Sequence, residues 1–149
     1  MKIEIISIVP ANRDDTWAVV MDIPKAASCI PGINEVIPNG EGSYTATLKA
    51  KVGPMGMTLV GTITVLSQDY DSGEAEFLIE ASDRGVGGGV KTNLTMRVTS
   101  KAADESELEI QADTTFMGRL GELGQPIIRR KARNTLEDFT KNLSKLLAS

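Results

Sequence analysis

Residues 118–143, GRLGELGQPIIRRKARNTLEDFTKNL, contain the segment that decides the fold. From Pro126 to Leu147 the apolar residues recur three and four positions apart, and this spacing predicts one long amphipathic helix. Its apolar stripe consists of Ile128, Ala132, Thr135, Leu136, Phe139, Leu143, Leu146 and Leu147. At 1.5 Å per residue, such a helix would be roughly 33 Å long.

Three glycines, Gly118, Gly121 and Gly124, precede this helix although glycine is a poor helix former, and they would lie on one helical side if this stretch is helical. A phosphate-binding Walker loop needs Lys-Ser or Lys-Thr directly after its last glycine, whereas Gln125 and Pro126 follow here. The dinucleotide-binding pattern needs a different glycine spacing. The sequence therefore argues against nucleotide binding, and Pro126 suits the first turn of a helix, where its missing N–H costs nothing.

Five segments before the helix alternate apolar and polar residues with a period of two. They are residues 44–52, 57–65, 76–81, 90–98 and 107–116. Strict alternation predicts an antiparallel sheet with one wet face and one buried face. Turn signals such as DSG and NGEG separate the segments.

The N-terminal part adds a strand and two short helices. Residues 3–9 form a β-rich run that Pro10 ends. Asn12 is a good N-cap for a helix over residues 13–21, and Pro24 opens a second helical turn. We expect an α+β fold with the order strand, two short helices, six strands and one long helix, in which a curved antiparallel sheet grips the long helix.

Length and composition are those of one globular domain, residues 1–149, with 41% apolar residues. No apolar run is long enough to span a membrane, and the start lacks a signal-peptide pattern, so we expect a cytoplasmic protein. The single Cys29 fits a reducing compartment. Histidine is absent, which removes the commonest general base and metal ligand. We expect no cofactor, no metal site and no catalytic residue.

The charge is unevenly distributed along the chain. The net charge is −4, yet from Arg119 onward seven basic residues stand against three acidic ones, a local charge of +4. Residues 1–118 carry nine basic and seventeen acidic residues, a local charge of −8. The acidic body and the 4% aromatic content argue against nucleic acid as a partner. The basic run Arg129, Arg130 and Arg133 is either a solvated helix face or a surface for an acidic partner or an anionic membrane.

The inward positions of the expected sheet include many small residues and two methionines. They include Ala46, Ala50, Gly61, Ala81, Ala112, Met57 and Met96. Small residues leave volume, and methionine lines adaptable apolar sites. From the residues alone, a tightly packed core and a ligand cavity under the helix are equally well supported.

Several short stretches resemble those of the CoxG family (the G-subunit of carbon monoxide dehydrogenase), within the START-like SRPBCC superfamily. These stretches are WAVVMD at 17–22, CIPG at 29–32, VGP at 52–54 with Gly61 after it, GVGGG at 85–89 and GRLGELGQ at 118–125. The resemblance implies a helix-grip fold, in which a seven-stranded antiparallel sheet wraps a C-terminal helix around a deep apolar cavity. It favours the cavity over the packed core.

The resemblance also implies a function. Proteins of this kind accompany carbon monoxide dehydrogenases and related molybdenum hydroxylases as accessory factors. We therefore expect a non-enzymatic binder or carrier of a hydrophobic small molecule, a quinone or lipid-like compound, with molybdenum hydroxylase subunits as partners and peripheral contact at the inner membrane face. Two alternatives stay open: an enzyme of the superfamily, of the cyclase or lyase type, and an assembly or recruitment factor acting through its basic helix.

The expected site residues follow from these patterns. The cavity wall would be formed by Leu48, Met57, Leu59, Ile63, Phe77, Ile79, Met96, Phe116, Leu120 and Ile128. An entrance or hinge would be formed by Gly118, Gly121, Gly124, Gly87 and Gly88, and alanine at 121 and 124 should stiffen it. The partner surface would be formed by Arg129, Arg130 and Arg133. Asp83 and Arg84 would form an exposed turn pair, and Cys29 would be structural.

Overall fold

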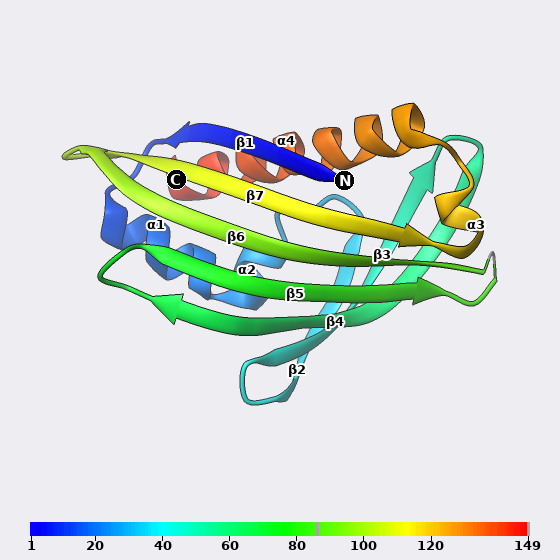
Figure 1. The fold of residues 1–149 in the computed structure, drawn as a ribbon. Helices are drawn as coiled ribbons and strands as arrows, with labels where there is room; N and C mark the ends of the chain where they lie inside the picture. The colour runs from blue at the N-terminus through cyan, green and yellow to red at the C-terminus, as the bar shows by residue number, and fades with distance from the viewer. Residues whose placement is uncertain (86, 149) are drawn as a thin grey trace.

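The computed structural model, which describes residues 1–85 and 87–148, has the α+β fold expected from the sequence (Figure 1). Seven strands form one antiparallel sheet in the order β1-β7-β6-β5-β4-β3-β2. The elements are β1 (Lys2–Val9), α1 (Arg13–Met21), α2 (Ile23–Ala27), β2 (Ile33–Gly40), β3 (Ser43–Val52), β4 (Met55–Asp69), β5 (Glu74–Asp83), β6 (Gly88–Ala102), β7 (Glu105–Met117), α3 (Gly118–Gly121) and α4 (Gln125–Ala148). The sheet curves, and α4 runs along its concave side next to β1 (Figure 1).

The two short helices begin as their capping residues predict. The Asn12 side chain accepts a hydrogen bond from the Asp15 backbone N–H at 2.8 Å, which satisfies a free donor in the first turn of α1. The Asp22 side chain caps α2 in the same way, at 3.4 Å from the Lys25 nitrogen. Trp17 of α1 meets Tyr70, which follows β4, edge to face at 6.1 Å between ring centroids. These contacts fix α1 against one end of the sheet.

Apolar residues pack at both ends of the space between sheet and α4. The larger cluster joins α1, α2 and the sheet to the C-terminal half of α4, where Phe139 and Leu143 are buried. The smaller cluster lies at the other end and consists of Val52, Met57 and Leu120. Residues of both clusters, among them Ile63, Phe139 and Leu120, line the cavity described below.

Two local features differ from the sequence expectation. Strand β2 shows no alternation of burial because it is an edge strand with register shifts and a left-handed residue, Glu35, at φ 49°. The three glycines before the long helix do not share one helical side. Gly118 and Gly121 bound the separate short helix α3, and Gly124 precedes α4.

Within residues 1–85 and 87–148, no helix is both long enough and apolar enough to span a membrane.

Candidate functional site: a cavity between the sheet and α4

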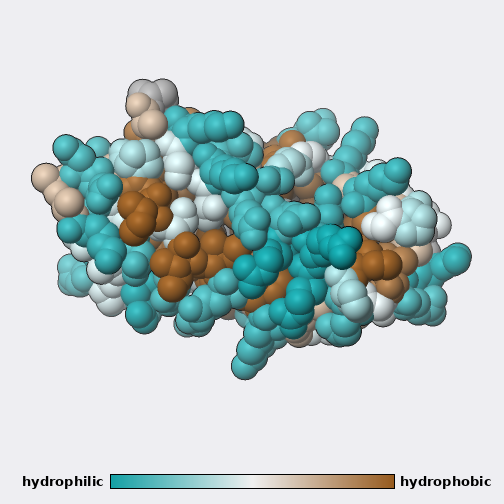
Figure 2. All heavy atoms as spheres, turned by 90° about the horizontal axis from the view of Figure 1, so that it is seen from above, coloured by the Kyte–Doolittle hydropathy of each residue, from teal (hydrophilic) through white to brown (hydrophobic). Residues whose placement is uncertain are grey.

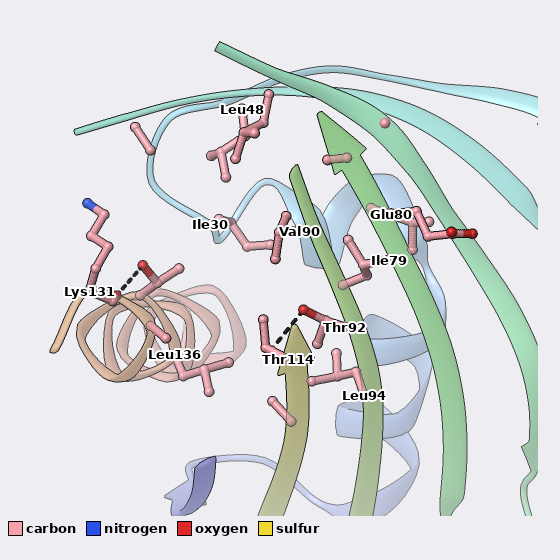
Figure 3. A pocket seen from close by; sticks show the side chains of 18 of the residues that line it. Ile30, Leu48, Ile79, Glu80, Val90, Thr92, Leu94, Thr114, Lys131 and Leu136 are labelled. Atoms are coloured by element: carbon pink, nitrogen blue, oxygen red, sulfur yellow. Dashed lines mark hydrogen bonds between the residues drawn. The ribbon is translucent and has the colours of Figure 1, made fainter. Parts of the chain in front are cut away.

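A cavity of about 250 Å³ lies between the concave face of the sheet and α4. This volume is just below the range for small-molecule sites, roughly 300–1,000 Å³. Most of its lining is aliphatic, and strands β3 to β7 together with α4 contribute most of the wall (Figure 3). A ligand here would be held chiefly by apolar contact.

Strand register explains why the space stays open. In the paired strands Ala46 lies opposite Gly61, Gly61 opposite Ala81, and Ala81 opposite Val90. This small-residue row, Ala46, Gly61, Ala81 and Val90, crosses four strands, and all its members line the cavity. Because these side chains are small, they leave open a space under α4 that larger side chains at the same positions would fill.

The cavity approaches solvent between β3 and α4. Its half-buried lining residues on these two elements are Leu48, Ala50, Lys131, Ala132, Thr135 and Leu136. Helix α4 packs closely along β1 but only sparsely on β3. Figure 3 shows Lys131 at the edge of the cavity, with its ammonium group turned away from the interior.

The structure brings eight of the ten expected wall residues together around the cavity. They are Leu48, Leu59, Ile63, Ile79, Met96, Phe116, Leu120 and Ile128. The other two lie elsewhere. Met57 belongs to the small cluster with Val52 and Leu120, and Phe77 is packed in the large core cluster.

Sequence reasoning missed several lining residues. Ile30 lies in the segment between α2 and β2, and Ile33 begins the irregular strand β2, so no periodicity could place either residue. Thr92 and Thr114 could have been found, because they stand at inward positions of their alternating strands, and Thr114 is buried. They were not among the expected wall residues, because that set was chosen from apolar side chains and threonine is polar.

The expected entrance glycines are packed closely against neighbouring backbone. A Cβ atom at Gly118 would lie 2.5 Å from the Gly87 oxygen, and one at Gly88 would lie 2.9 Å from the Leu120 Cβ. The Arg119 N–H donates to the Gly87 oxygen at 2.8 Å. These glycines let β6 and α3 approach each other, and their part in an entrance stays a prediction. Val86, within the same glycine run, lies outside the described residues.

The expectation that alanine would stiffen positions 121 and 124 does not fit this backbone. A Cβ atom at Gly121 would lie 2.9 Å from the Phe116 oxygen. Gly124 has φ 91°, which strains any residue with a Cβ atom. Alanine at either position would cost stability instead of adding helix preference.

Ionisable groups are sparse in the described part of the lining, which contains Glu80 and Lys131. The Glu80 side chain is exposed and points away from the interior (Figure 3). Two ionisable groups pointing into the cavity would favour an acid–base enzyme of the cyclase or lyase type. In the described lining no ionisable side chain points into the interior, and Lys131 lies at the edge. No cluster of three metal-ligating side chains occurs in the described ranges.

The other charged and nucleophilic residues have structural surroundings. Asp83 is not an exposed turn residue but is buried, and its carboxylate accepts a hydrogen bond from the Thr58 N–H at 2.8 Å. This contact bridges β4 and β5 beyond their last paired residues, Val60 and Ser82. Burial raises the pKa of the Cys29 thiol, which is the opposite of what a reactive cysteine requires.

The basic residues of the expected partner surface are exposed on α4. Arg129 donates to the Lys2 carbonyl oxygen at 3.3 Å, and Arg133 lies 4.0 Å from Glu137. Seen from above, this face is mainly hydrophilic, with separate hydrophobic patches (Figure 2). Arg130 forms no ion pair with any residue of the described ranges.

Comparison with known proteins identifies the relatives of this chain. The sequence model of the CoxG family, the G-subunit of carbon monoxide dehydrogenase, matches residues 7–148. Among curated proteins, none was found to match.

Solved structures with the same fold extend over nearly the whole chain. A conserved protein from Geobacillus kaustophilus is 19% identical with a TM-score of 0.90, covering 99% of this chain and 95% of its own. A START superfamily protein from Mycobacterium smegmatis is 13% identical with a TM-score of 0.69, covering 99% and 97%. The ZhuI aromatase/cyclase from Streptomyces sp. R1128 is 14% identical with a TM-score of 0.72, covering 99% and 93%. At these identities the likeness shows a START-like helix-grip fold and nothing about activity.

Proposed function

Because the chain belongs to the CoxG family of carbon monoxide dehydrogenase proteins, we propose that it is a non-enzymatic binder or carrier of a hydrophobic small molecule. The ligand is a quinone or a lipid-like compound held between the sheet and α4. The observation that carries this proposal is the cavity of about 250 Å³ whose lining is almost entirely apolar. Burial of apolar ligand surface at about 25 cal/mol per Å² would drive binding.

The size of the cavity constrains the ligand. A compound of one or two fused rings fits a volume of this order, whereas a long isoprenoid or acyl tail would extend out between β3 and α4. A carrier needs such an opening because its ligand has to enter and leave without unfolding of the protein.

The test begins with the protein as purified. Extraction with organic solvent followed by mass spectrometry should reveal a bound lipophile, and titration with a short-tailed menaquinone analogue should show saturable binding. Replacing Ala132 of the lining with Phe should fill the cavity and abolish uptake. Replacing the exposed Asn134 with Phe adds the same side chain outside the cavity and serves as the control. No bound species and no saturable uptake would contradict the proposal.

The accessory role is part of the same proposal and is supported by the family to which the chain belongs. In this role the protein delivers or receives its ligand at a carbon monoxide dehydrogenase or a related molybdenum hydroxylase. The expected observation is a molybdenum hydroxylase encoded beside this protein, whose subunits copurify with it. Absence of both would leave ligand binding intact and remove the accessory role.

A further inference from the structure

Two threonines form a polar pair inside the otherwise apolar cavity. Thr92 of β6 and Thr114 of β7 lie directly opposite each other in the paired strands. Both line the cavity, and their hydroxyl oxygens are 3.0 Å apart (Figure 3). Leu94 and Ala112, the next inward pair along these two strands, are apolar.

A count of donors shows that this pair is incompletely satisfied. Each threonine hydroxyl has one hydrogen to donate and two lone pairs to accept with. The bond between the two hydroxyls uses one of the two hydrogens. Within residues 1–85 and 87–148, neither side chain makes a further hydrogen bond, so one O–H is left without an acceptor.

Thr135, a further threonine of the cavity lining, has no unused donor. Thr135 of α4 donates its hydroxyl hydrogen to the Lys131 carbonyl oxygen at 2.7 Å, so its donor is already used. Thr62 is also counted in the lining, but it pairs with Glu80 in register and shares that residue's outward side of the sheet. The unused donor in the interior therefore belongs to Thr92 and Thr114.

We propose that the Thr92–Thr114 pair is the hydrogen-bonding site for a carbonyl oxygen on an otherwise apolar ligand. The inference rests on the proposed ligand-binding function and adds the polar feature that the ligand must carry. Thr114 is buried and Thr92 is half-buried, so a donor of this pair forms fewer bonds to water than an exposed hydroxyl, and an acceptor on the ligand supplies one. The pair thereby selects a ketone, ester or quinone over a hydrocarbon of the same shape, and fixes its orientation in the cavity.

Two probes of equal carbon skeleton separate this hydrogen bond from apolar burial. One is 2,3-dimethyl-1,4-naphthoquinone, whose methyl groups block thiol addition, and the other is 2,3-dimethylnaphthalene. Affinities are measured by displacement of a fluorescent apolar dye. In a variant with both threonines replaced by Val, which keeps the side-chain shape, the quinone should bind about 5- to 10-fold more weakly. The affinity for the hydrocarbon should stay the same or rise.

The single variants sharpen the test. Thr92→Val and Thr114→Val each leave one hydroxyl whose hydrogen is no longer used by the other threonine. Each single variant should therefore lose less quinone affinity than the double variant. Thr135→Val is the matched control, because its hydroxyl is already engaged with Lys131, and it should leave the preference between the probes unchanged.

The outcomes are distinguishable. Equal weakening of both probes by the double variant, or no change in either, would overturn the inference while leaving the proposed function intact. Failure of the unmodified protein to bind either probe, or any other lipophile, would overturn the proposed function and this inference together. Thermal unfolding of each variant confirms that it folds, and the single variants carry the test if the double variant does not.

Discussion

At Gly61 the backbones of β4 and β5 lie so close that no side chain fits between them. A Cβ atom there would lie 1.9 Å from the Glu80 oxygen and 2.5 Å from the Ala81 Cα. Both of these are backbone atoms, so the neighbours cannot move aside by changing a rotamer. Gly61 also belongs to the small-residue row that lines the cavity. The absence of a side chain there thus allows β4 and β5 to approach closely and also leaves volume in the cavity.

Replacing Gly61 with Ala should therefore destabilise the protein by about 1–3 kcal/mol, the usual cost of overpacking. At Gly56, in the same strand, a Cβ atom would have no other atom within 4 Å, and Gly56→Ala should change stability by no more than about 0.5 kcal/mol. Urea denaturation of both variants measures the difference. Equal stability of the two variants would show that β4 and β5 adjust more easily than their spacing indicates.

Cys29 provides a second prediction for a single residue. Desolvation raises the pKa of its thiol above 9.0, and a hydrogen bond involving Ser28 offsets this only in part. Because the folded-state pKa lies above the unfolded value, the thiol's contribution to stability is complete below pH 9.0 and is lost as the pH rises through the folded-state pKa. The free energy of unfolding should fall more between pH 8 and pH 10 in the unmodified protein than in Cys29→Ala.

Reagent access gives an independent check on the same thiol. Cys29 is 4% exposed, so an aromatic disulfide reagent at pH 8 should react with the native protein at least on the order of tenfold more slowly than with the protein in urea. Equal rates would mean that the segment around Cys29 opens readily.

Among the elements, α4 has two parts with different surroundings. Towards its C-terminus Leu143 is fully buried in the large cluster. One turn before Phe139, Leu136 is half-buried and faces the cavity. The helical stripe read from the sequence contains both residues and does not distinguish them, because periodicity reports which side of a helix is covered and not what covers it.

Alanine substitutions should separate the two parts of α4. Leu143→Ala should cost about 2–5 kcal/mol, since it opens a new void in a packed region. Leu136→Ala enlarges a space that already exists, so its cost should be smaller, while the affinity for bulky apolar probes should change. Chemical denaturation and dye displacement on the two variants measure both effects. Similar losses of stability in both variants would contradict this division of the helix.

Some elements could be predicted from the sequence and others could not. The alternating strands, the Asn12 cap of α1 and the start of α2 near Pro24 could be predicted because they depend on neighbours a few residues apart. Strand β2 could not be located, because its edge position and register shifts leave no alternation. The spacing of the glycines before α4 places them on one side of a helix, whereas left-handed backbone at Gly118 and Gly124 breaks the segment into separate pieces.

For the whole molecule, the cavity depends on which strands become neighbours. The sequence shows that Ala46, Gly61 and Ala81 are small and point inward, but not that they meet in one row. That row forms only when strand register is set across the sheet, and register depends on turns and bulges that periodicity does not report. The choice between a packed core and a cavity therefore lay beyond what the residue pattern alone could decide.

The charge distribution leads to the last prediction, which concerns the whole surface. The chain from Arg119 onward carries seven basic against three acidic residues, while residues 1–118 carry nine against seventeen. Arg129, Arg130 and Arg133 are exposed on α4, the same element that borders the cavity opening. If this face contacts an anionic membrane, binding to vesicles should require phosphatidylglycerol and should weaken as salt is added.

Reversing Arg129, Arg130 and Arg133 to Glu should then lower vesicle affinity by at least about tenfold, since each basic residue near the surface contributes about 1 kcal/mol. Reversing the exposed Lys49, Lys51 and Lys91 of the sheet changes the net charge by the same amount and is the matched control. Cosedimentation with phosphatidylcholine vesicles, with and without phosphatidylglycerol, measures both variants. Equal losses would attribute binding to net charge, and a loss confined to the arginine variant would assign it to α4, because the control variant leaves that helix unaltered.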